Sequence, residues 1–246
     1  MSSNGAGPTI IIPARLESTR LPRKLLLDQT GKPLLQHTWE QARKCQRARR
    51  VVIATDSTEI HEKATRWGAE VVMTGPADSG SARANAAAEF LHLRDVVVNI
   101  QGDEPEVDPA AIDALVLLMQ GGPLDNGGHW PVGTLACPLD AERDYHTRSV
   151  VKVVAVRNRA VYFTRSGLNG ALRHIGVYAY QPYALKCFVQ DQRAGRTPLA
   201  AAEDLEQLYF IEAGWVVGLH VVPSAPPGID TAGDYEAFVK RMGKRA

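Results

Sequence analysis

The sequence of 246 residues has little cysteine and no long hydrophobic run. Its three cysteines, Cys45, Cys137 and Cys187, are odd in number and widely spaced, and they form no CxxC or Cys/His pattern, so neither a disulfide framework nor a zinc site is indicated. No apolar stretch approaches the roughly 18 residues that cross a bilayer. Residues 1–8, MSSNGAGP, lack the apolar core of a signal peptide. We therefore expect free buried thiols, a disordered segment 1–8, no membrane partner and a cytoplasmic location.

An excess of charge of one sign is also missing, because 28 Lys and Arg residues nearly balance 27 Asp and Glu residues. This balance argues against a nucleic-acid partner, which a strongly basic surface would attract. Neither the Walker pattern GxxxxGK[ST] nor GxGxxG occurs. A hydrophobic content of 45% is enough for a real core. The length fits one α/β domain, or one domain with a small appendage.

Runs rich in β-branched residues alternate with segments of helical spacing. We expect strands at 9–13, 50–55, 70–74, 95–100, 132–139, 150–156, 160–165 and 173–180. Helices are expected at 33–45, 57–68, 81–93, 182–192, 202–213 and 231–242, and a loop at 120–131. The first four strands alternate with helices, which predicts βαβ units and a mainly parallel sheet. The predicted strands of the second half indicate a mixed sheet.

A basic segment, PARLESTRLPRK, follows the first predicted strand. It carries Arg15, Arg20, Arg23 and Lys24 within a few residues. Ligands of open α/β sheets lie beyond the carboxyl ends of the strands, so this loop is placed to bind an anion such as a polyphosphate. The alternative is a solvated basic loop, which is what most charge clusters are.

Two acidic segments, NIQGDEP and PPGIDTAGD, also follow apolar, strand-like stretches. The first presents Asp103 and Glu104, and the second presents Asp230. Carboxylates suit a hard divalent cation that would neutralise a polyphosphate. For Asp103 a plain Asx turn is the alternative, and N-capping of the following helix explains Asp230 about as well as metal binding does.

Six segments together resemble one enzyme family. IIPARLESTRLPRK, VVIATD, VNIQGDEP, RHIGVYAY, LEQL and GIDT occur in the order, and at nearly the spacing, of the 3-deoxy-manno-octulosonate (Kdo) cytidylyltransferases, the CMP-Kdo synthetases of lipopolysaccharide synthesis. The resemblance runs from about Thr9 to the C-terminal helix. It implies a Rossmann-like, three-layer α/β nucleotidyltransferase fold with a mainly parallel, mixed sheet and a small second subdomain. A single domain 9–246 would have a nucleotide-binding half at about 9–120 and a sugar-binding and dimerisation half at about 130–230.

The resemblance also implies an activity and residues that perform it. CMP would pass from CTP to the anomeric hydroxyl of a 2-keto sugar acid, with release of pyrophosphate, and Mg²⁺ would be the cofactor. Arg15, Lys24 and Asp103 would be catalytic, and Asp103 and Asp230 would hold the metal. The nucleotide would contact Ala14, Arg15, Ser18, Arg20, Lys24, Thr55, Asp56, Ser79, Gly80 and Arg83. The sugar acid would contact Gln101, Arg173, His174, Tyr178, Glu206 and Gln207.

Some of these residues have ordinary structural interpretations. His174 could be a satisfied core histidine, and Tyr178 could pack in a strand with its hydroxyl at the surface. Glu206 and Gln207 would by default belong to the solvated face of a helix. Only the resemblance raises these four above those alternatives.

The chain departs from the family pattern in two loops. Ala82 stands where the family has an acidic residue, after a loop, MTGPAD, that is one residue short, and the segment 166–172 is shortened. A different acidic sugar, a different nucleotide, or a nucleotide-binding paralogue without turnover therefore stay open as alternatives. The family resemblance also implies a homodimer, for which the stretch VYAYQPY (177–183) and the neighbouring apolar strands of the second half are the expected exposed contact.

Overall fold

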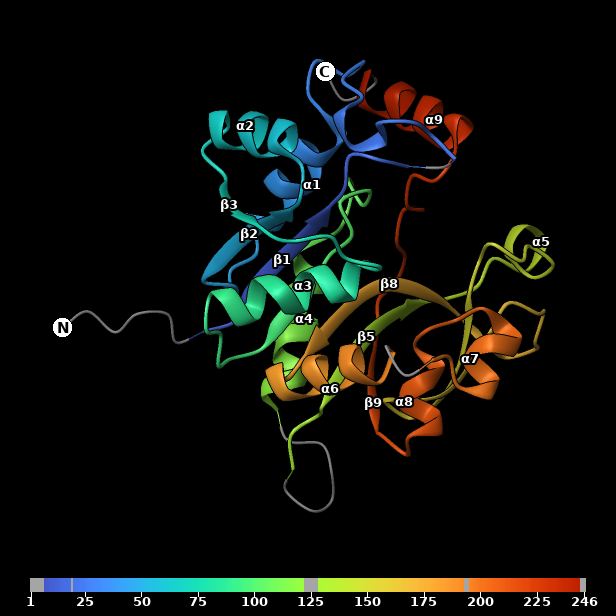
Figure 1. Cartoon of the computed structure of the whole chain (residues 1–246). Helices are drawn as coiled ribbons and strands as arrows, with labels where there is room; N and C mark the ends of the chain where they lie inside the picture. Colours follow the sequence, from blue (N-terminus) through green and yellow to red (C-terminus); the bar gives the residue numbers. More distant parts are fainter. Residues whose placement is uncertain (1–6, 19, 122–127, 193–194, 244–246) are drawn as a thin grey trace. The chain divides into compact units, whose positions relative to one another are not determined.

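The structure, a computed structural model, describes residues 7–18, 20–121, 128–192 and 195–243. It divides into two compact units (Figure 1). The first comprises Met1–Leu93, Asn99–Ala110 and Pro226–Ala246, and the second comprises Arg94–Val98 and Ala111–Ala225. The expected halves followed chain order, whereas the C-terminal segment from Pro226 belongs with the first unit. Of the segment 1–8, residues 1–6 lie outside the described residues, and Pro8 is buried and accepts a hydrogen bond from Arg49 N.

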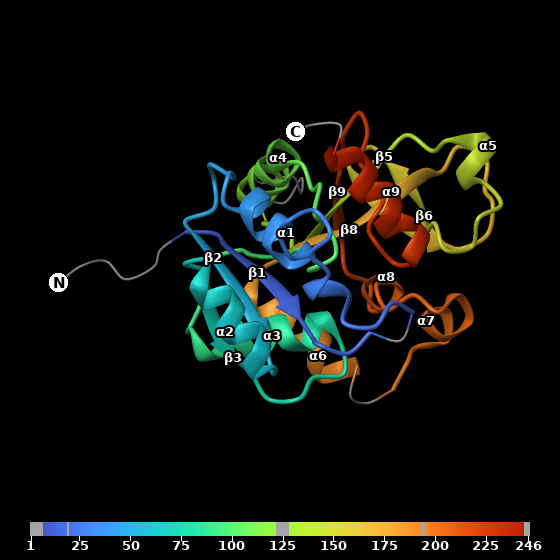
Figure 2. The ribbon, with the colours of Figure 1, turned by 90° about the horizontal axis from the view of Figure 1, so that it is seen from above.

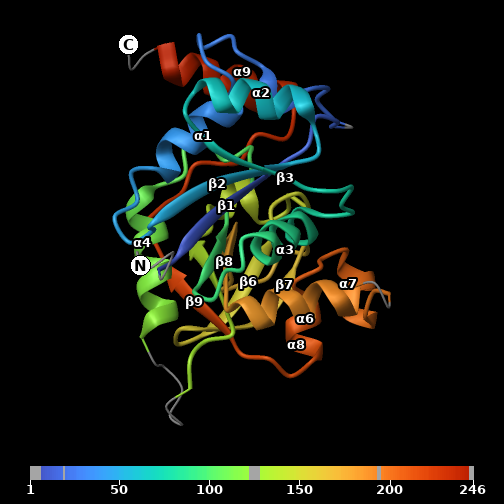
Figure 3. The same ribbon diagram turned by 60° about the vertical axis from the view of Figure 1, so that its left-hand side comes forward.

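The first unit is a parallel sheet covered by helices on both faces. Its elements are β1 (Thr9–Ala14), η1 (Lys24–Leu26), α1 (Leu34–Ala42), β2 (Arg50–Thr55), α2 (Thr58–Arg66), β3 (Glu70–Met73), α3 (Gly80–Phe90) and α9 (Ala232–Gly243). The strands lie in the order β3-β2-β1, and both pairings are parallel. Figures 1 and 3 show α1 and α2 on one face of these strands and α3 on the other. Because β1 is buried at all six residues, the prediction of strands covered on both faces is confirmed there.

Short polar residues begin the helices that follow the strands. Ser57 caps α2 by accepting a hydrogen bond from Ile60 N, and Ser79 caps α3 by accepting one from Ala82 N. Each cap follows the carboxyl end of a strand, so the first turns of α2 and α3 begin at that edge of the sheet. This placement brings backbone N–H groups to the edge where α/β proteins bind ligands.

The second unit holds a mixed sheet. Its elements are α4 (Pro109–Gln120), β5 (Val132–Cys137), α5 (Ala141–Asp144), β6 (Lys152–Val156), β7 (Arg159–Thr164), β8 (Leu172–Tyr180), α6 (Pro182–Gln192), α7 (Pro198–Glu203), α8 (Leu208–Glu212) and β9 (Val217–Val221), and α4 begins in the first unit. The strand order is β8-β5-β9-β7-β6, and β6 pairs with β8 as well. Figure 2 shows β5, β6, β8 and β9 of this sheet from above. Among the described pairings of these five strands, β5 and β9 pair in parallel, whereas β5–β8, β6–β7, β6–β8 and β7–β9 are antiparallel. The predicted mixed α/β class is confirmed.

The remaining strand, β4 (Val97–Asn99), spans the boundary of the units. Four elements escaped the sequence analysis: the short helices η1 and α5, the helix α4 and the strand β9. In α4 the run PAAIDALVLLMQ is apolar on most sides, so it lacks the alternation of polar and apolar faces that marks a surface helix. No helix in the described part of the chain is both long and apolar enough to cross a membrane.

Two further expectations were wrong. The helix predicted at 202–213 is split into α7 and α8, because Asp204 adopts a left-handed conformation, with φ of 54°, and ends α7. The stretch 177–183 is not an exposed contact surface. Tyr178 and Tyr180 are buried within the chain, at 8% and 1% exposure, and only Tyr183, at 58%, is open.

Candidate functional site

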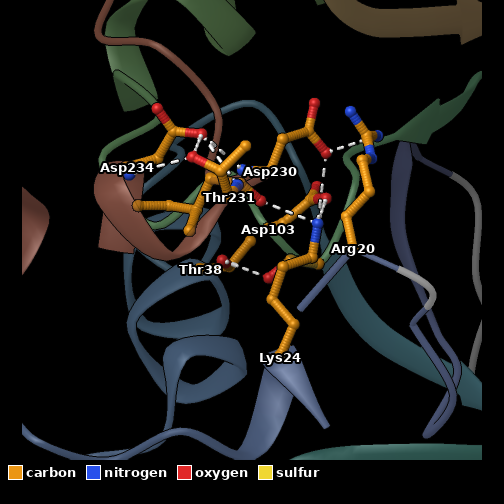
Figure 4. Close-up of polar contacts among 9 residues, drawn as sticks. Arg20, Lys24, Thr38, Asp103, Asp230, Thr231 and Asp234 are labelled. Atoms are coloured by element: carbon orange, nitrogen blue, oxygen red, sulfur yellow. Dashed lines mark hydrogen bonds and ion pairs between the residues drawn. The ribbon is translucent and has the colours of Figure 1, made fainter. Parts of the chain in front are cut away.

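Lys24 forms the centre of a charged cluster in the first unit (Figure 4). Its Nζ donates to Asp103 Oδ2 at 2.5 Å, to Ile229 O at 2.7 Å and to Asp230 Oδ1 at 3.4 Å. The Lys24 side chain is only 10% exposed, whereas those of Asp103 and Asp230 are 25% and 46% exposed. Arg20, on the open side, donates to the same Oδ1 of Asp230 at 2.8 Å. Two cations therefore hold two carboxylates that lie far apart in the sequence.

Backbone contacts bring these segments together. Ile229 N donates to Asp103 O at 3.0 Å, and Thr38, from α1, donates through Oγ1 to Gly102 O at 2.9 Å. Gly228 lies so close to Glu104 that a Cβ at residue 228 would stand 2.7 Å from the Oε1 of Glu104. A larger residue at 228 would therefore displace the Glu104 carboxylate from its position beside this segment.

Helix α9 is capped by the side chains of Thr231 and Asp234, and the carboxylate of Asp230 takes no part in the cap. Thr231 Oγ1 accepts a hydrogen bond from Asp234 N, and Asp234 Oδ2 accepts bonds from the backbone N of Thr231 and Asp230. This reciprocal pattern is a capping box. Burial raises the pKa of Asp234, but the bonds from Thr231 and Asp230 outweigh it and leave the pKa lowered. The alternative interpretation of Asp230 as the helix cap is wrong, and its side chain is left to Lys24 and Arg20.

The oxygen atoms around Lys24 suit a hard cation. Asp103 and Asp230 supply carboxylates, which Mg²⁺ prefers, and Mg²⁺ commonly takes only one or two protein carboxylates. The described residues contain no group of three or more His, Cys, Asp and Glu side chains that could hold a metal. The donor set therefore fits a metal that completes its shell with phosphate oxygens and water, and it does not fit a closed protein cage.

A polar cavity of about 150 Å³ lies at the carboxyl end of β1. Its lining consists of Pro13, Ala14, Arg15, Ala77, Asp78, Ser79, Gly80, Arg83 and Gln101. Arg15 is exposed, and none of its contacts in the described structure is a hydrogen bond or an ion pair. The first turn of α3 opens onto the cavity at Gly80, where the backbone N–H groups and the helix dipole favour an anion. The cavity can therefore hold a phosphate-bearing ligand.

Close packing defines one wall of this cavity. A Cβ at Gly80 would stand 2.8 Å from Gln101 Oε1, so a larger residue there would displace the Gln101 amide from this wall. Gln101 was predicted on the sugar side, but the structure places it beside the residues predicted for the nucleotide. It belongs to the first unit, whereas the other five predicted sugar residues belong to the second.

Arg83 and Asp56, both predicted for the nucleotide, bind each other. Arg83 is nearly buried, with 4% of its side chain exposed, and it donates to Asp56 Oδ2 and Thr74 Oγ1, each at 2.7 Å. Thr55 is buried at the end of β2, and its Oγ1 accepts a hydrogen bond from Ser57 N. These contacts make Arg83 a fixed support of the cavity wall. Among the other predicted nucleotide residues, Ser18 is half-buried and Arg20 is exposed.

The predicted sugar residues of the second unit gather at β8 and at the α7–α8 turn. Burial lowers the pKa of His174 to about 3, so the ring is neutral at physiological pH. Burial, followed by the charges of Tyr180 and Glu206, raises the pKa of Tyr178 well above its usual value, so its phenol keeps its proton. Glu206 is exposed and accepts a hydrogen bond from Gln192, whereas Gln207 is buried. Because Tyr178 is buried, the alternative that its hydroxyl group lies at the surface is wrong.

One charged residue that the sequence analysis missed, Lys152, pairs with Arg173 across two strands. Arg173 donates through Nε to Cys137 Sγ at 3.3 Å and through NH2 to Ala225 O. Lys152, opposite it in β6, is fully buried, and burial lowers its pKa. Its Nζ donates to Thr147 O at 2.7 Å. A lysine within an apolar strand pattern, KVVAV, was the available signal for this buried charge.

Known proteins resemble the whole chain. The cytidylyltransferase family model matches residues 9–217. A 3-deoxy-manno-octulosonate cytidylyltransferase of Chlorobium chlorochromatii (strain CaD3) is 44% identical over 242 residues, which are 92% of this chain and 93% of the relative. One from Brucella ovis is 40% identical and covers 92% of each chain.

Solved structures agree with these matches. The structure of a CMP:2-keto-3-deoxy-manno-octonic acid synthetase complexed with CTP is 31% identical, with a TM-score of 0.88, over 98% of this chain and 100% of that one. A cytidylyltransferase from Leptospira borgpetersenii, 20% identical over 97% of this chain and 87% of its own, with a TM-score of 0.63, shares the fold. By family model, sequence identity and fold alike, the chain belongs to the cytidylyltransferase family.

Proposed function

We propose that this protein transfers CMP from CTP to the anomeric hydroxyl of Kdo and releases pyrophosphate, as a step of lipopolysaccharide synthesis. The two relatives named above carry the name of this activity, and the solved synthetase that is 31% identical to this chain is complexed with CTP. The observation that carries the proposal is the pairing of Asp103 and Asp230 around Lys24, beside a loop of arginines. A protein that only bound nucleotide would have no evident use for two carboxylates held in this way.

The residues of the first unit hold and orient CTP. Arg15 and the N–H groups at the start of α3 would bind phosphate oxygens in the cavity, and Gln101 and Ser79 would line the space beside them. The hydroxyl oxygen forms a bond to the α-phosphorus as the bond to the pyrophosphate oxygen breaks, and the hydroxyl proton passes to water. Negative charge grows on the leaving group, and positioned cations lower that barrier.

Lys24 holds the aspartates before any ligand arrives. Its three N–H groups match three protein acceptors, Asp103, Ile229 and Asp230. Contact with a phosphate would therefore replace one of them, and the 3.4 Å contact to Asp230 is the weakest. We assign to Lys24 the positioning of both carboxylates as well as contact with phosphate.

Mg²⁺ is the proposed cofactor, and Asp103 and Asp230 are its proposed ligands. Bound there, it would neutralise the triphosphate and polarise the phosphoryl oxygens. Arg20, which shares Asp230 with Lys24, restrains that carboxylate from the exposed side.

The second unit supplies the proposed contacts to the sugar acid. Arg173, His174, Tyr178, Glu206 and Gln207 all belong to it. The neutral ring of His174 and the protonated phenol of Tyr178 can hydrogen-bond to hydroxyl groups without adding charge to a substrate that is already an anion.

We further propose a cytoplasmic homodimer. In the second unit, Val156, Val161 and Val221 expose 59%, 37% and 44% of their surface on strands β6, β7 and β9. Of the surface expected for the dimer contact, these apolar strands stay as the candidate, whereas the stretch 177–183 is mostly buried.

A pyrophosphate-release assay tests the function. CTP, UTP and ATP are each combined with Kdo, sialic acid and related sugar acids in the presence of Mg²⁺. We expect release only with CTP and Kdo, and Asp103→Asn serves as the inactive control. Release with CTP and a different sugar acid would support the alternative acceptor, which the shortened segment 166–172 makes the main competitor. Silence across the panel in a protein that binds CTP would refute the proposal in favour of a paralogue without turnover.

A further inference from the structure

The hydroxyl group of Thr134 lies between the ring of His174 and backbone carbonyls of β8. Its hydrogen bonds allow only one placement of the hydroxyl proton and of the proton on the His174 ring. Its Oγ1 lies 2.8 Å from Val177 O, 3.4 Å from Ile175 O and 3.0 Å from His174 Nε2. A carbonyl oxygen only accepts, so the single hydroxyl proton of Thr134 points to Val177 O, the closer of the two. The contact with His174 therefore requires a proton on Nε2, which donates to Thr134 Oγ1.

A bulge in β8 creates this arrangement. The register between β5 and β8 shifts directly after Thr134, so that Gly176 and Val177 are two extra residues on β8. Such bulges free backbone groups from the ladder and redirect side chains, often beside active sites. Here the Thr134 hydroxyl satisfies the carbonyl of Val177, and the rings of His174 and Tyr178 lie with their centroids 5.4 Å apart. Four residues of a regular strand would separate them by about 13 Å.

The other ring nitrogen of His174 is left without a proton. Because burial keeps the ring neutral, only one nitrogen is protonated, and the bond to Thr134 assigns that proton to Nε2. Phe163 packs edge-on against the ring, with centroids 5.2 Å apart, and so restricts its rotation. Within the described residues, Nδ1 has no hydrogen-bond partner. It therefore presents a lone pair that can only accept.

We propose that Thr134 is a positioning residue, which fixes His174 as the Nε2–H tautomer so that Nδ1 accepts a hydrogen bond from a hydroxyl group of the sugar acid. The inference rests on the proposed function, because it assigns His174 to that substrate. A bare lone pair repels a carboxylate, so His174 selects a hydroxyl, and the carboxylate of the sugar acid must bind elsewhere. A sugar acid without that hydroxyl would leave Nδ1 unpaired and would be rejected.

Two variants separate positioning from packing. Thr134→Val has nearly the same shape but no hydroxyl, and Thr134→Ser keeps the hydroxyl but loses the methyl group. In Thr134→Val the Nε2–H would face a methyl group and become an unsatisfied donor, which favours transfer of the proton to Nδ1. If the competent tautomer falls to about a tenth of the population, the apparent KM for the sugar acid rises roughly tenfold, because affinity scales with the competent fraction.

The tautomer is measured first, without substrate. Long-range ¹⁵N–¹H correlation spectra distinguish the two tautomers, and the His174→Gln variant identifies the signals of His174. We expect Nε2–H in the native chain and in Thr134→Ser, and mainly Nδ1–H in Thr134→Val. Because no substrate is present, this result stands or falls independently of the proposed reaction.

Steady-state kinetics then follow, with Kdo and CTP varied separately. We expect the rise in KM for Kdo in Thr134→Val, an unchanged KM for CTP, and near-native values in Thr134→Ser. An Nε2–H signal that persists in Thr134→Val would overturn the proposal. So would a changed tautomer with an unchanged KM for Kdo, or equal losses in both variants, which would indicate packing alone.

Discussion

Replacing Lys24 by methionine tests whether this residue holds the two aspartates together. Methionine keeps the apolar stem and removes the ammonium group. The Lys24 side chain is 10% exposed and bonds to Asp103 at 2.5 Å, so the loss leaves a carboxylate that is only 25% exposed without its cation. Removing one partner of a buried pair costs about 3–5 kcal/mol, and partial exposure of Asp103 reduces this to about 2–3 kcal/mol. Urea unfolding of the native chain and of Lys24→Met measures the difference.

Double-mutant cycles divide this loss between the two aspartates. We expect a coupling of about 2 kcal/mol for Lys24→Met with Asp103→Asn, typical of a hydrogen bond to a charged group. The coupling with Asp230→Asn should be about 0.5 kcal/mol, because that contact is 3.4 Å long, 46% of the Asp230 side chain is exposed, and Arg20 also binds it. The exposed pair Lys32–Glu40, at 2.8 Å, is the matched control and should give about 0.5 kcal/mol or less. Coupling to Asp103 no larger than that of the control, or smaller than that to Asp230, would refute the reasoning.

Four further outcomes are expected. Asp103→Asn and Asp230→Asn should each fold normally but lose most turnover and need more Mg²⁺ for half-maximal rate. Glu104→Gln is the control and should lose less activity. Full activity of Asp230→Asn at limiting Mg²⁺ would contradict the two-aspartate site. Arg15→Ala should reduce kcat/KM for CTP roughly 10- to 100-fold, the loss of one charge-assisted contact, with stability changed by about 0.5 kcal/mol or less, and native kinetics would remove Arg15 from the phosphate site. Since the pKa of His174 is about 3 in the folded chain and 6.5 as a model value, the unfolded chain binds the extra proton between these values, so stability is fully present above pH 6.5 and falls as the pH drops toward 3. As the pH falls from 6.5 toward 3, the native chain should lose about 2 kcal/mol more of its free energy of unfolding than His174→Gln loses, after allowance for the partial exposure of His174. Parallel pH profiles of the two proteins would show that the ring is not desolvated. Light scattering at micromolar concentration should report a dimer that Val161→Lys weakens, and a monomeric native chain would refute the assembly.

Local patterns predicted most elements of the fold. Runs such as TIIIP and RVVIAT mark β1 and β2 because consecutive β-branched residues suit strands that are buried on both faces. Helix α6 was predicted with its observed bounds, 182–192. The break at Asp204 was missed because glycine usually marks a left-handed helix end, whereas here an aspartate adopts that conformation and Leu205 N closes the end on Ala200 O at 3.1 Å.

The site was predictable as a set of residues but not as a geometry. The sequence indicated Arg20, Lys24, Asp103 and Asp230, and the structure shows that all four belong to one cluster. The sequence analysis left Asp230 open between a metal ligand and a helix cap. The T-x-x-D pattern of Thr231 and Asp234 was the signal that could have identified the true cap. The partnership of Arg83 with Asp56 depends on side-chain packing that no local pattern encodes.

The bond from Lys24 to Ile229 spans 205 residues of sequence, and this separation has a consequence for synthesis on the ribosome. Contacts between distant residues form late, because the chain between them must first be ordered. The β1–β2–β3 sheet, by contrast, is complete once residue 73 has emerged. A nascent chain that lacks the segment from Pro226 onward would therefore contain the folded sheet and the residues of the phosphate cavity. Its Lys24 and Asp103 would not yet be joined by Asp230. Asp230, the second proposed metal ligand, would therefore join the cluster only after the sheet has formed, so a truncated chain could fold this sheet and still lack the proposed metal site.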